Sequence, residues 1–388
     1  VNLPAGTAGD VVAIKDYAGT FDTNKVTLVQ NGSDKIGGST INATLSTEGL
    51  AVTLVFVDAT QGWLVTDNGT QDTAPTAKYV TATGGTITCS GDYRIHTFTG
   101  PGALCVSCAG NPAGSALVDY LVVGGGGGGG SAAPGNTGAA GGAGGFRESP
   151  GTASGSYTVS PLGTSPAVAL SVPVASYPIT VGGGGAGGPM SPSKQKGTSG
   201  SNSIFSTITS AGGGGGGYGN GPSPDAGLYG IDGGSGGGAG GRNGTPYQAA
   251  SKGQGNTPPV SPSQGNPGGA AKTCTSNSND SAGGGGGATA TGSNASNPEG
   301  PSGNGGAGAT TSISATPTAY AGGGAGGNNS GGTSAGTGGT GGGGNGSNNN
   351  VGGAGTDNTG GGGGGAGTGG NAGGAGGSGI VIIRYKFQ

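Results

Sequence analysis

Four cysteines and a single histidine are the residues in this sequence best suited to metal or redox chemistry. Cys105 and Cys108 have the C-x-x-C spacing of zinc and redox sites, with Cys89 and His96 close in sequence. The segment around them has the pattern of a strand, however, and residues three apart on a strand face opposite sides. We therefore expect no metal site. A disulfide from Cys89 to Cys105 or Cys108, and free thiols, both stay open.

Catalysis by a Ser-His-Asp triad would have to use His96, because the chain has no other histidine. His96 lies within residues 93–98, whose alternation is typical of an ordinary strand position. The acidic residues are few and flanked by glycine, and no pair is placed for glycoside hydrolysis. The sequence thus predicts a protein that is not an enzyme and uses no cofactor.

A nucleotide site is the other chemistry that the sequence imitates. Val123 runs directly into seven glycines at 124–130, which resembles the strand-to-glycine start of a phosphate loop. That chemistry needs a helix N-terminus after the glycines and a Lys-Ser/Thr pair or a later acidic residue. The following residues, 131–135, read Ser-Ala-Ala-Pro-Gly and offer neither. We expect no nucleotide to bind here.

The charge pattern excludes two further classes of partner. The formal net charge is −3, charged residues make up 7% of the chain, and the cationic residues are scattered. No basic patch is present, so we expect no nucleic-acid binding. No stretch of about 20 apolar residues suggests a membrane span, and no signal-peptide pattern occurs. The sequence starts at Val1 and its one methionine is Met190, so we expect a processed chain or a part of a longer one.

Glycine is distributed very unevenly along the chain. Of 106 glycines, 16 lie in positions 1–118 and 90 in the remaining 270 positions. That is one residue in three, against a usual share of about 7%. The change marks a domain boundary, and we divide the chain into a β module at 1–70, a connector with strands at 71–118, and a glycine-rich domain at 119–388.

The first 118 residues consist of β-branched and aromatic runs separated by turn residues. No stretch has the i, i+3, i+4 apolar spacing of a substantial helix. Two strongly apolar runs, at 117–123 and 379–387, bracket the glycine-rich region. We expect these two strands to pair and to close the ends of that region.

The high glycine content of the glycine-rich region disfavours an α-helix, because each glycine in a helix costs about 1 kcal/mol of stability relative to alanine. The glycine runs lack the strict three-residue period of collagen. The alternative is a bundle of left-handed polyglycine-II helices with three residues per turn, whose outward N–H and C=O groups bond laterally. The predicted fold class is therefore an all-β N-terminal region plus a polyglycine-II bundle, with essentially no α-helix.

Longer segments with few glycines interrupt the runs, at 146–181, 189–211, 218–232, 242–282 and 288–320. We expect them to form loops at the ends or along an edge of the bundle, where binding residues usually lie. Aromatic and arginine side chains dominate binding hot spots, and lysines suit acidic surface glycans. The candidate binding residues are Lys194, Lys196, Tyr218, Tyr229, Arg242 and Tyr247.

Residues 93–100, 118–123, 177–185 and 377–385 together resemble the glycine-rich domain of bacteriophage tail fibres and adhesins. The opening segments 9–17 and 62–67 are similar to a β module in fibre proteins of marine phages. The resemblance implies a polyglycine-II sandwich whose loops recognise a bacterial surface receptor, either an outer-membrane protein or a glycan. Cys105 and Cys108 depart from it, because they stand where Phe, Thr or Val is expected.

We therefore expect an extracellular virion fibre protein, a homotrimer that contacts other fibre or tail proteins. Two alternatives stay open. The first is a head-fibre or capsid decoration protein without receptor specificity. The second is an ice-binding polyglycine protein, which the irregular loops disfavour.

Overall fold

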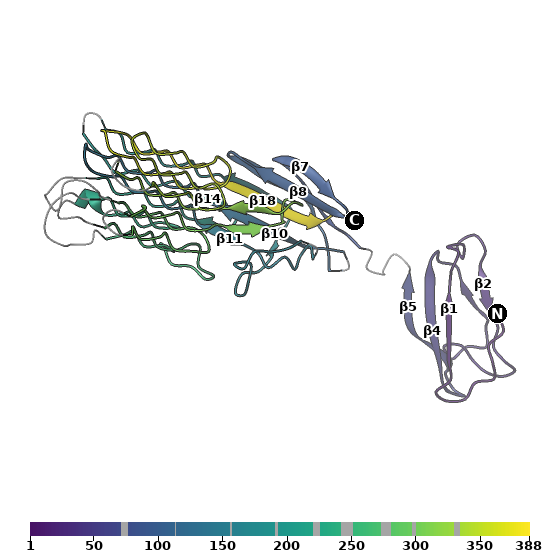
Figure 1. The fold of residues 1–388 in the computed structure, drawn as a ribbon. Helices are drawn as coiled ribbons and strands as arrows, with labels where there is room; N and C mark the ends of the chain where they lie inside the picture. Colours follow the sequence, from purple (N-terminus) through teal and green to yellow (C-terminus); the bar gives the residue numbers. More distant parts are fainter. Residues whose placement is uncertain are drawn as a thin grey trace. The chain divides into compact units, whose positions relative to one another are not determined.

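The computed structural model describes every residue except 71–76, 113, 156, 191–192, 220–225, 242–250, 273–280, 297–299 and 330–333. The chain divides into two compact units, Val1–Ala77 and Lys78–Gln388 (Figure 1). Residues 78–118, which the sequence groups with the connector, belong to the second unit because their strands pair with strands of the glycine-rich region.

The first unit is a small β structure with its own apolar core. Its strands are β1 (Val11–Lys15), β2 (Val26–Leu28), β3 (Ala43–Leu45), β4 (Leu50–Asp58) and β5 (Gly62–Thr70). They form a three-stranded antiparallel sheet in the order β1-β4-β5 and a β2–β3 hairpin. Alternate residues of β4, Val52, Leu54 and Phe56, are buried against Trp63, so the period-2 pattern sets the inner face.

The second unit holds the remaining strands. They are β6 (Val80–Thr83), β7 (Thr86–Ser90), β8 (Tyr93–Phe98), β9 (Gly102–Ala109), β10 (Leu117–Val123), β11 (Phe146–Glu148), β12 (Leu170–Ser171), β13 (Ala175–Thr180), β14 (Ser203–Phe205), β15 (Ile208–Ser210), β16 (Ala309–Thr311), β17 (Thr318–Tyr320) and β18 (Ile380–Lys386). Within the described residues the only helical element is the 3₁₀ turn η2 (Ala226–Leu228). The prediction of an all-β chain without α-helix is confirmed.

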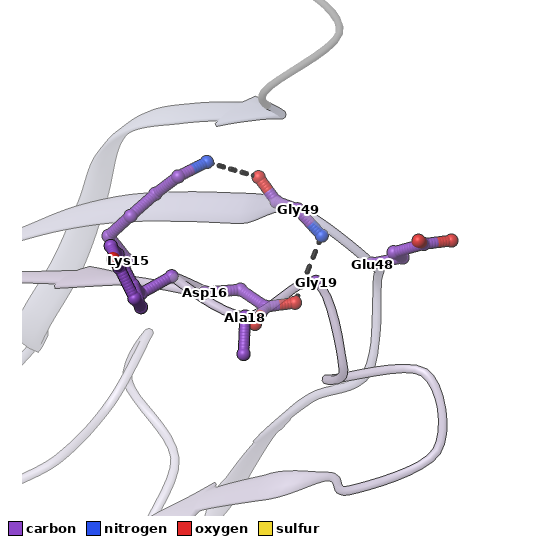
Figure 2. Close-up of a pocket in the computed structure, with 7 residues that line it drawn as sticks. Lys15, Asp16, Ala18, Gly19, Glu48 and Gly49 are labelled. Atoms are coloured by element: carbon purple, nitrogen blue, oxygen red, sulfur yellow. Dashed lines mark hydrogen bonds between the residues drawn. The ribbon is translucent and has the colours of Figure 1, made fainter.

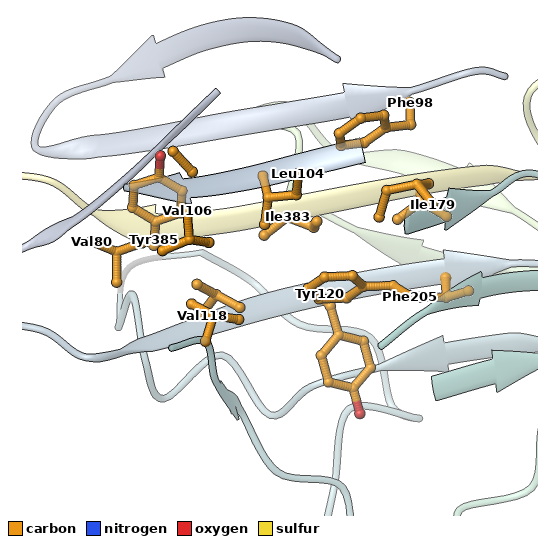
Figure 3. Close-up of a cluster of buried hydrophobic side chains, with 14 residues drawn as sticks. Val80, Phe98, Leu104, Val106, Val118, Tyr120, Ile179, Phe205, Ile383 and Tyr385 are labelled. Carbon is orange, nitrogen blue, oxygen red and sulfur yellow. The ribbon is translucent and has the colours of Figure 1, made fainter. Parts of the chain in front are cut away.

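Two of these sheets pack face to face as a sandwich. One has the order β11-β10-β18-β8-β7, with β12 beside β10, and the other has the order β15-β14-β13-β9-β6. Side chains from both sheets meet in one buried cluster, in which Tyr120 and Ile383 face Leu104, Ile179 and Phe205 (Figure 3). This cluster is the main apolar core of the second unit.

The two strands that bracket the glycine-rich region lie side by side. β10 pairs with β18 antiparallel, with Leu121 opposite Ile382 and Val123 opposite Ile380. β18 also pairs with β8, so it occupies the middle of its sheet. The expected pairing of the two apolar runs is therefore present, and it brings the start and the end of the glycine-rich region together.

Both faces of β10 and β18 are covered. Tyr120 and Val122 face the sandwich core, whereas Leu121 and Val123 belong to a second buried cluster on the opposite face. Side chains of the β16–β17 hairpin and its turn, such as Ile313, complete this second cluster. Burial on both faces explains why the two strands read as continuous apolar runs.

Glycine segments continue directly from the sandwich. We call residues 124–132, which follow β10 without a break, the first rod. Every backbone N–H in it donates a hydrogen bond of 2.8 to 3.1 Å to another segment. The donors fall into three sets by the segment that accepts: 124, 127 and 130 to 139–145; 125, 128 and 131 to 195–201; 126, 129 and 132 to 371–377. Each direction recurs every third residue, which is the threefold repeat of polyglycine II.

The carbonyl groups of the first rod have the same arrangement. They accept from three other segments: 213–219, 185–188 and 363–366. Along the first rod, the residue numbers of its three accepting partners decrease as its own numbers increase, so these segments run antiparallel to it. The residue numbers of the three donating partners increase together with its own, so these segments run parallel to it. The first rod therefore has six neighbours, three antiparallel and three parallel, and the backbone groups that polyglycine II turns outward are paired laterally.

Close packing of backbones explains why glycine fills this rod. A Cβ added to Gly126 would come within 2.0 Å of the Gly361 carbonyl oxygen, and one added to Gly127 within 2.2 Å of that of Gly214. Real Cβ atoms do not approach an oxygen so closely. Side chains are excluded from the inner positions, and lateral hydrogen bonds take the place of an apolar core.

Rods at the margin of the lattice need glycine at fewer positions. In 195–201, a Cβ added to Gly197 or Gly200 would collide with the first rod, whereas Thr198 and Ser199 between them are exposed. This corrects the expectation that 189–211 is a loop: residues 195–201 form a rod, because one glycine in three is enough when only one side is packed. Segments such as 265–271 and 301–308 are bonded into the lattice in the same way.

Candidate binding surface at the loop end of the rods

The first rod defines two ends of the glycine-rich lattice. It leaves β10 at Val123 and reaches Ala132 at the end away from the sandwich, which we call the loop end. Ser131 brings two further segments to this end. Its hydroxyl accepts from the Gln195 N–H at 2.8 Å, and its carbonyl accepts from the Gly219 N–H at 3.0 Å. In Figure 1 the 3₁₀ turn η2 also lies at this end, away from β10 and β18.

Lys194 and Tyr218 come together at the loop end. The Lys194 ammonium lies 5.9 Å from the centroid of the Tyr218 ring, a distance at which a cation–π attraction acts. The ring lies against the backbone of η2, since a Cβ added to Gly227 would come within 1.9 Å of it. The Tyr218 N–H also donates to the Gly227 carbonyl at 3.0 Å. A half-buried tyrosine and a lysine are thus held on a rigid backbone.

Tyr229 follows η2 directly and is 37% exposed. The residue before it, Leu228, is buried with Ala239 and Ala271 and anchors the turn. Lys196 lies two residues from Lys194 on the marginal rod and is half-buried. Of the predicted binding residues, the structure therefore brings Lys194 and Tyr218 into contact, and it places Tyr229 on the segment that follows. Arg242 and Tyr247 lie outside the described residues.

Hydrogen-bonding residues that the sequence prediction missed lie at the same end. The Asn371 carbonyl accepts from the Ala132 N–H, and the Asn371 amide donates to the Asn349 and Thr368 carbonyls, both at 2.8 Å. The Thr368 hydroxyl donates to the Asn349 side-chain oxygen at 2.9 Å. The run of three asparagines at 348–350, where a glycine segment stops, was the available sequence signal.

The cysteines do not form a joint site. Cys89 lies on β7, and Cys105 and Cys108 lie on β9 of the other sheet; all three are free thiols, so the disulfide that was left open is not formed among them. Cys274 lies outside the described residues. In the part of the chain that the structure describes, no three His, Cys, Asp or Glu side chains gather as metal ligands would.

His96 is completely buried between strands. Its Nδ1–H donates to the Gly84 carbonyl at 2.7 Å, and its Nε2 accepts from the Tyr385 hydroxyl at 2.9 Å. Burial lowers the pKa of the imidazole, and the nearby Arg94 charge lowers it further. With both ring nitrogens engaged and the ring neutral, His96 acts as a structural link between β8 and β18.

A cluster of buried charged side chains lies under the loop that follows β11. Asp119 accepts from the Ser149 and Ser154 hydroxyls at 2.7 and 2.6 Å, and Glu148 accepts from the Ser160 N–H at 3.0 Å. Burial raises the pKa of Glu148. Arg384, opposite Asp119 on β18, is buried too. These contacts fasten the loop to the sandwich.

No helix among the described residues has both the length and the apolar character needed to cross a membrane. A search among curated proteins finds no match to the sequence. A family model described as a glycine-rich domain matches residues 107–386, which include β10, the rods and β18. Because this match covers more than half of the 388 residues, the chain belongs to the glycine-rich domain family.

Proposed function

We propose that this chain is a bacteriophage virion fibre or adhesin protein, whose polyglycine lattice is a rigid scaffold for loops that recognise the host surface. The partner would be an outer-membrane protein or a glycan on the bacterial cell. The chain would form a homotrimer, and other fibre or tail proteins would attach this trimer to the particle. The sequence resemblance to tail-fibre glycine-rich domains supports this reading.

One observation carries the proposal: the closely packed rods consist of glycine, whereas larger side chains gather at the loop end. The glycines of the first rod leave no room for a side chain, so these positions cannot vary with the ligand. Lys194, Tyr218 and Tyr229 lie where the lattice stops and side chains are free to differ. Tyrosine on a rigid support is well suited to binding, since its ring offers a large contact area and has few rotatable bonds to order. Arg242 and Tyr247 stay in the proposal as sequence predictions.

The test uses the purified full chain and particles that carry it. Gold-labelled antibody against the chain should mark the distal part of the tail in electron micrographs. An excess of free chain should reduce adsorption of the particles to host cells. Label spread over the capsid, with adsorption unchanged, would favour the decoration-protein alternative and contradict the adhesin proposal.

A further inference from the structure

A pocket in the first unit lies between the loop after β1 and the turn before β4. Its volume is about 680 Å³, within the range of 300 to 1,000 Å³ that is usual for small-ligand sites. The lining comes from the two segments Lys15–Gly19 and Glu48–Gly49. Figure 2 labels six of these residues: Lys15, Asp16, Ala18, Gly19, Glu48 and Gly49.

Hydrogen bonds hold the walls of this pocket in place. The buried Asp16 carboxylate accepts from the N–H groups of Thr20, Phe21 and Gly49 at 3.0 to 3.1 Å, which ties the two segments together. The Lys15 ammonium donates to the Gly49 carbonyl at 2.5 Å (Figure 2). Burial alone would raise the pKa of Asp16, but the backbone donors outweigh it and lower the pKa. The pocket is therefore preformed, which spares a ligand the cost of ordering it.

Three side chains are left to meet a ligand. Tyr17 is one of the residues at the pocket, and it is 99% exposed, so its ring adds nothing to the packing of the fold. The exposed Glu48 carboxylate lies above Gly19, whose added Cβ would be 3.6 Å from Glu48 Oε1, and no hydrogen bond to it occurs within the described residues. Lys15 has three donors and uses one on Gly49.

We infer that this pocket binds a neutral saccharide. Hydroxyl groups can donate to Glu48 and accept from Lys15 at the same time, so a neutral polyol satisfies both charged groups. The apolar face of a sugar ring would cover the exposed Tyr17 ring, which supplies a large contact area with few rotatable bonds. The site lies in the first unit and does not depend on the loop end of the second.

The experiment is saturation-transfer NMR on the full chain with a panel of neutral sugars: glucose, galactose, mannose, N-acetylglucosamine and their short oligomers. At least one should receive saturation from the protein. Tyr17→Ala and Glu48→Gln should each weaken its binding by about tenfold or more, while Tyr17→Phe retains most of it. Ile41→Ala, which changes an exposed side chain of the same unit outside the pocket lining, is the control and should bind as the unchanged chain does.

Three results would overturn the inference: no sugar of the panel binds, binding survives in both Tyr17→Ala and Glu48→Gln, or an acidic sugar such as sialic acid binds more tightly than every neutral one. Thermal unfolding of each variant checks the fold. Tyr17 is exposed, so its removal should leave the melting temperature unchanged. If Tyr17→Ala nevertheless misfolds, the sugar affinities of Tyr17→Phe and Glu48→Gln are compared instead. Retained binding in the first and weakened binding in the second support the inference, and equal binding in both contradicts it.

Discussion

The carbonyl oxygen of Gly361 lies 2.0 Å from the point where a Cβ on Gly126 would be. The two residues belong to neighbouring rods far apart in sequence, and their backbones touch. Gly183, in a marginal rod, has no atom within 4 Å of the corresponding point. Both are glycines in runs of glycine, but only the first is enclosed. The pair therefore separates the effect of packing from that of composition.

We predict that Gly126→Ala destabilises the second unit by about 1 to 3 kcal/mol, and Gly126→Val by more, because the added atoms must push rods apart. Unfolding followed by circular dichroism measures this loss. Trp63, the one tryptophan, is buried in the first unit and reports on that unit through its fluorescence. The unfolding transition of the first unit, followed by this fluorescence, should be the same in both variants as in the unchanged chain.

Gly183→Ala is the matched control. Its Cβ has room, so the variant should be as stable as the unchanged chain, or more stable by about 0.4 to 1 kcal/mol because alanine restricts the unfolded chain. Equal losses for Gly126→Ala and Gly183→Ala would mean that the inner rods are not packed as closely as described.

The strands were the most predictable part of the fold. Residues 117–123 and 380–386 stand out as apolar runs, and pairing them needs only the idea that a long ordered region must be closed. The neighbours of each rod could not be predicted, because one glycine run reads like another and lateral bonding carries no side-chain code. Marginal rods resemble loops in the sequence: the low glycine content of 189–211 predicts a loop, although Gly197 and Gly200 have the three-residue spacing of a rod.

The candidate binding surface was predictable only in part. Residue type alone selected Lys194 and Tyr218, and the structure adds the contact between them. That contact depends on Ser131 and Gly227, which have no side-chain chemistry that marks them in the sequence. The pocket at Tyr17 was missed because Asp16 and Gly49, distant in sequence, create it.

A second prediction concerns the closing strand. Ile382 is buried between β10 and β8, so Ile382→Ala should cost about 2 to 5 kcal/mol in the second unit. Val351→Ala removes the same kind of side chain where it is 56% exposed, and should stay within about 0.5 kcal/mol. Urea unfolding of both variants gives the comparison. A small loss for Ile382→Ala would contradict the role of β18 as the closing strand.

A third prediction is a pH dependence that comes from His96. Its pKa is lowered in the folded chain, whereas in the unfolded chain it returns to about 6.5. Below that value the unfolded state binds more protons, so stability should fall as the pH decreases from about 7 to about 5. In His96→Gln this loss should be smaller. Urea titrations at several pH values measure it.

Glu148 acts with the opposite sign, because its raised pKa lets the folded chain hold the proton more readily. The difference between the unchanged chain and His96→Gln, rather than either curve alone, is therefore the readout. Parallel curves would show that His96 does not control the pH dependence.

A fourth prediction tests the loop end. Lys194→Ser with Tyr218→Ser removes the cation–π pair but no lattice hydrogen bond made by an inner rod glycine. We expect the second unit to lose about 1 to 3 kcal/mol and to stay folded, because the double change also removes the packing of the Tyr218 ring on η2. Adsorption to host cells should fall strongly, as it does when a binding hot spot is removed. Thr209→Ser, an exposed change on β15 of the sandwich, is the control. Adsorption that survives the double change would refute a role for this pair.

Hydrogen exchange of the first rod is the most direct test of the lattice on which every proposal for the second unit rests. In glycine-labelled protein, the amides of Gly124–Gly130 should all be strongly protected, and should lose protection together near the global unfolding free energy, because they donate in turn to three neighbouring segments. A solvated glycine chain of the same sequence would exchange at once. Fast exchange at these amides, or protection in only one residue of three, would contradict the six-neighbour arrangement.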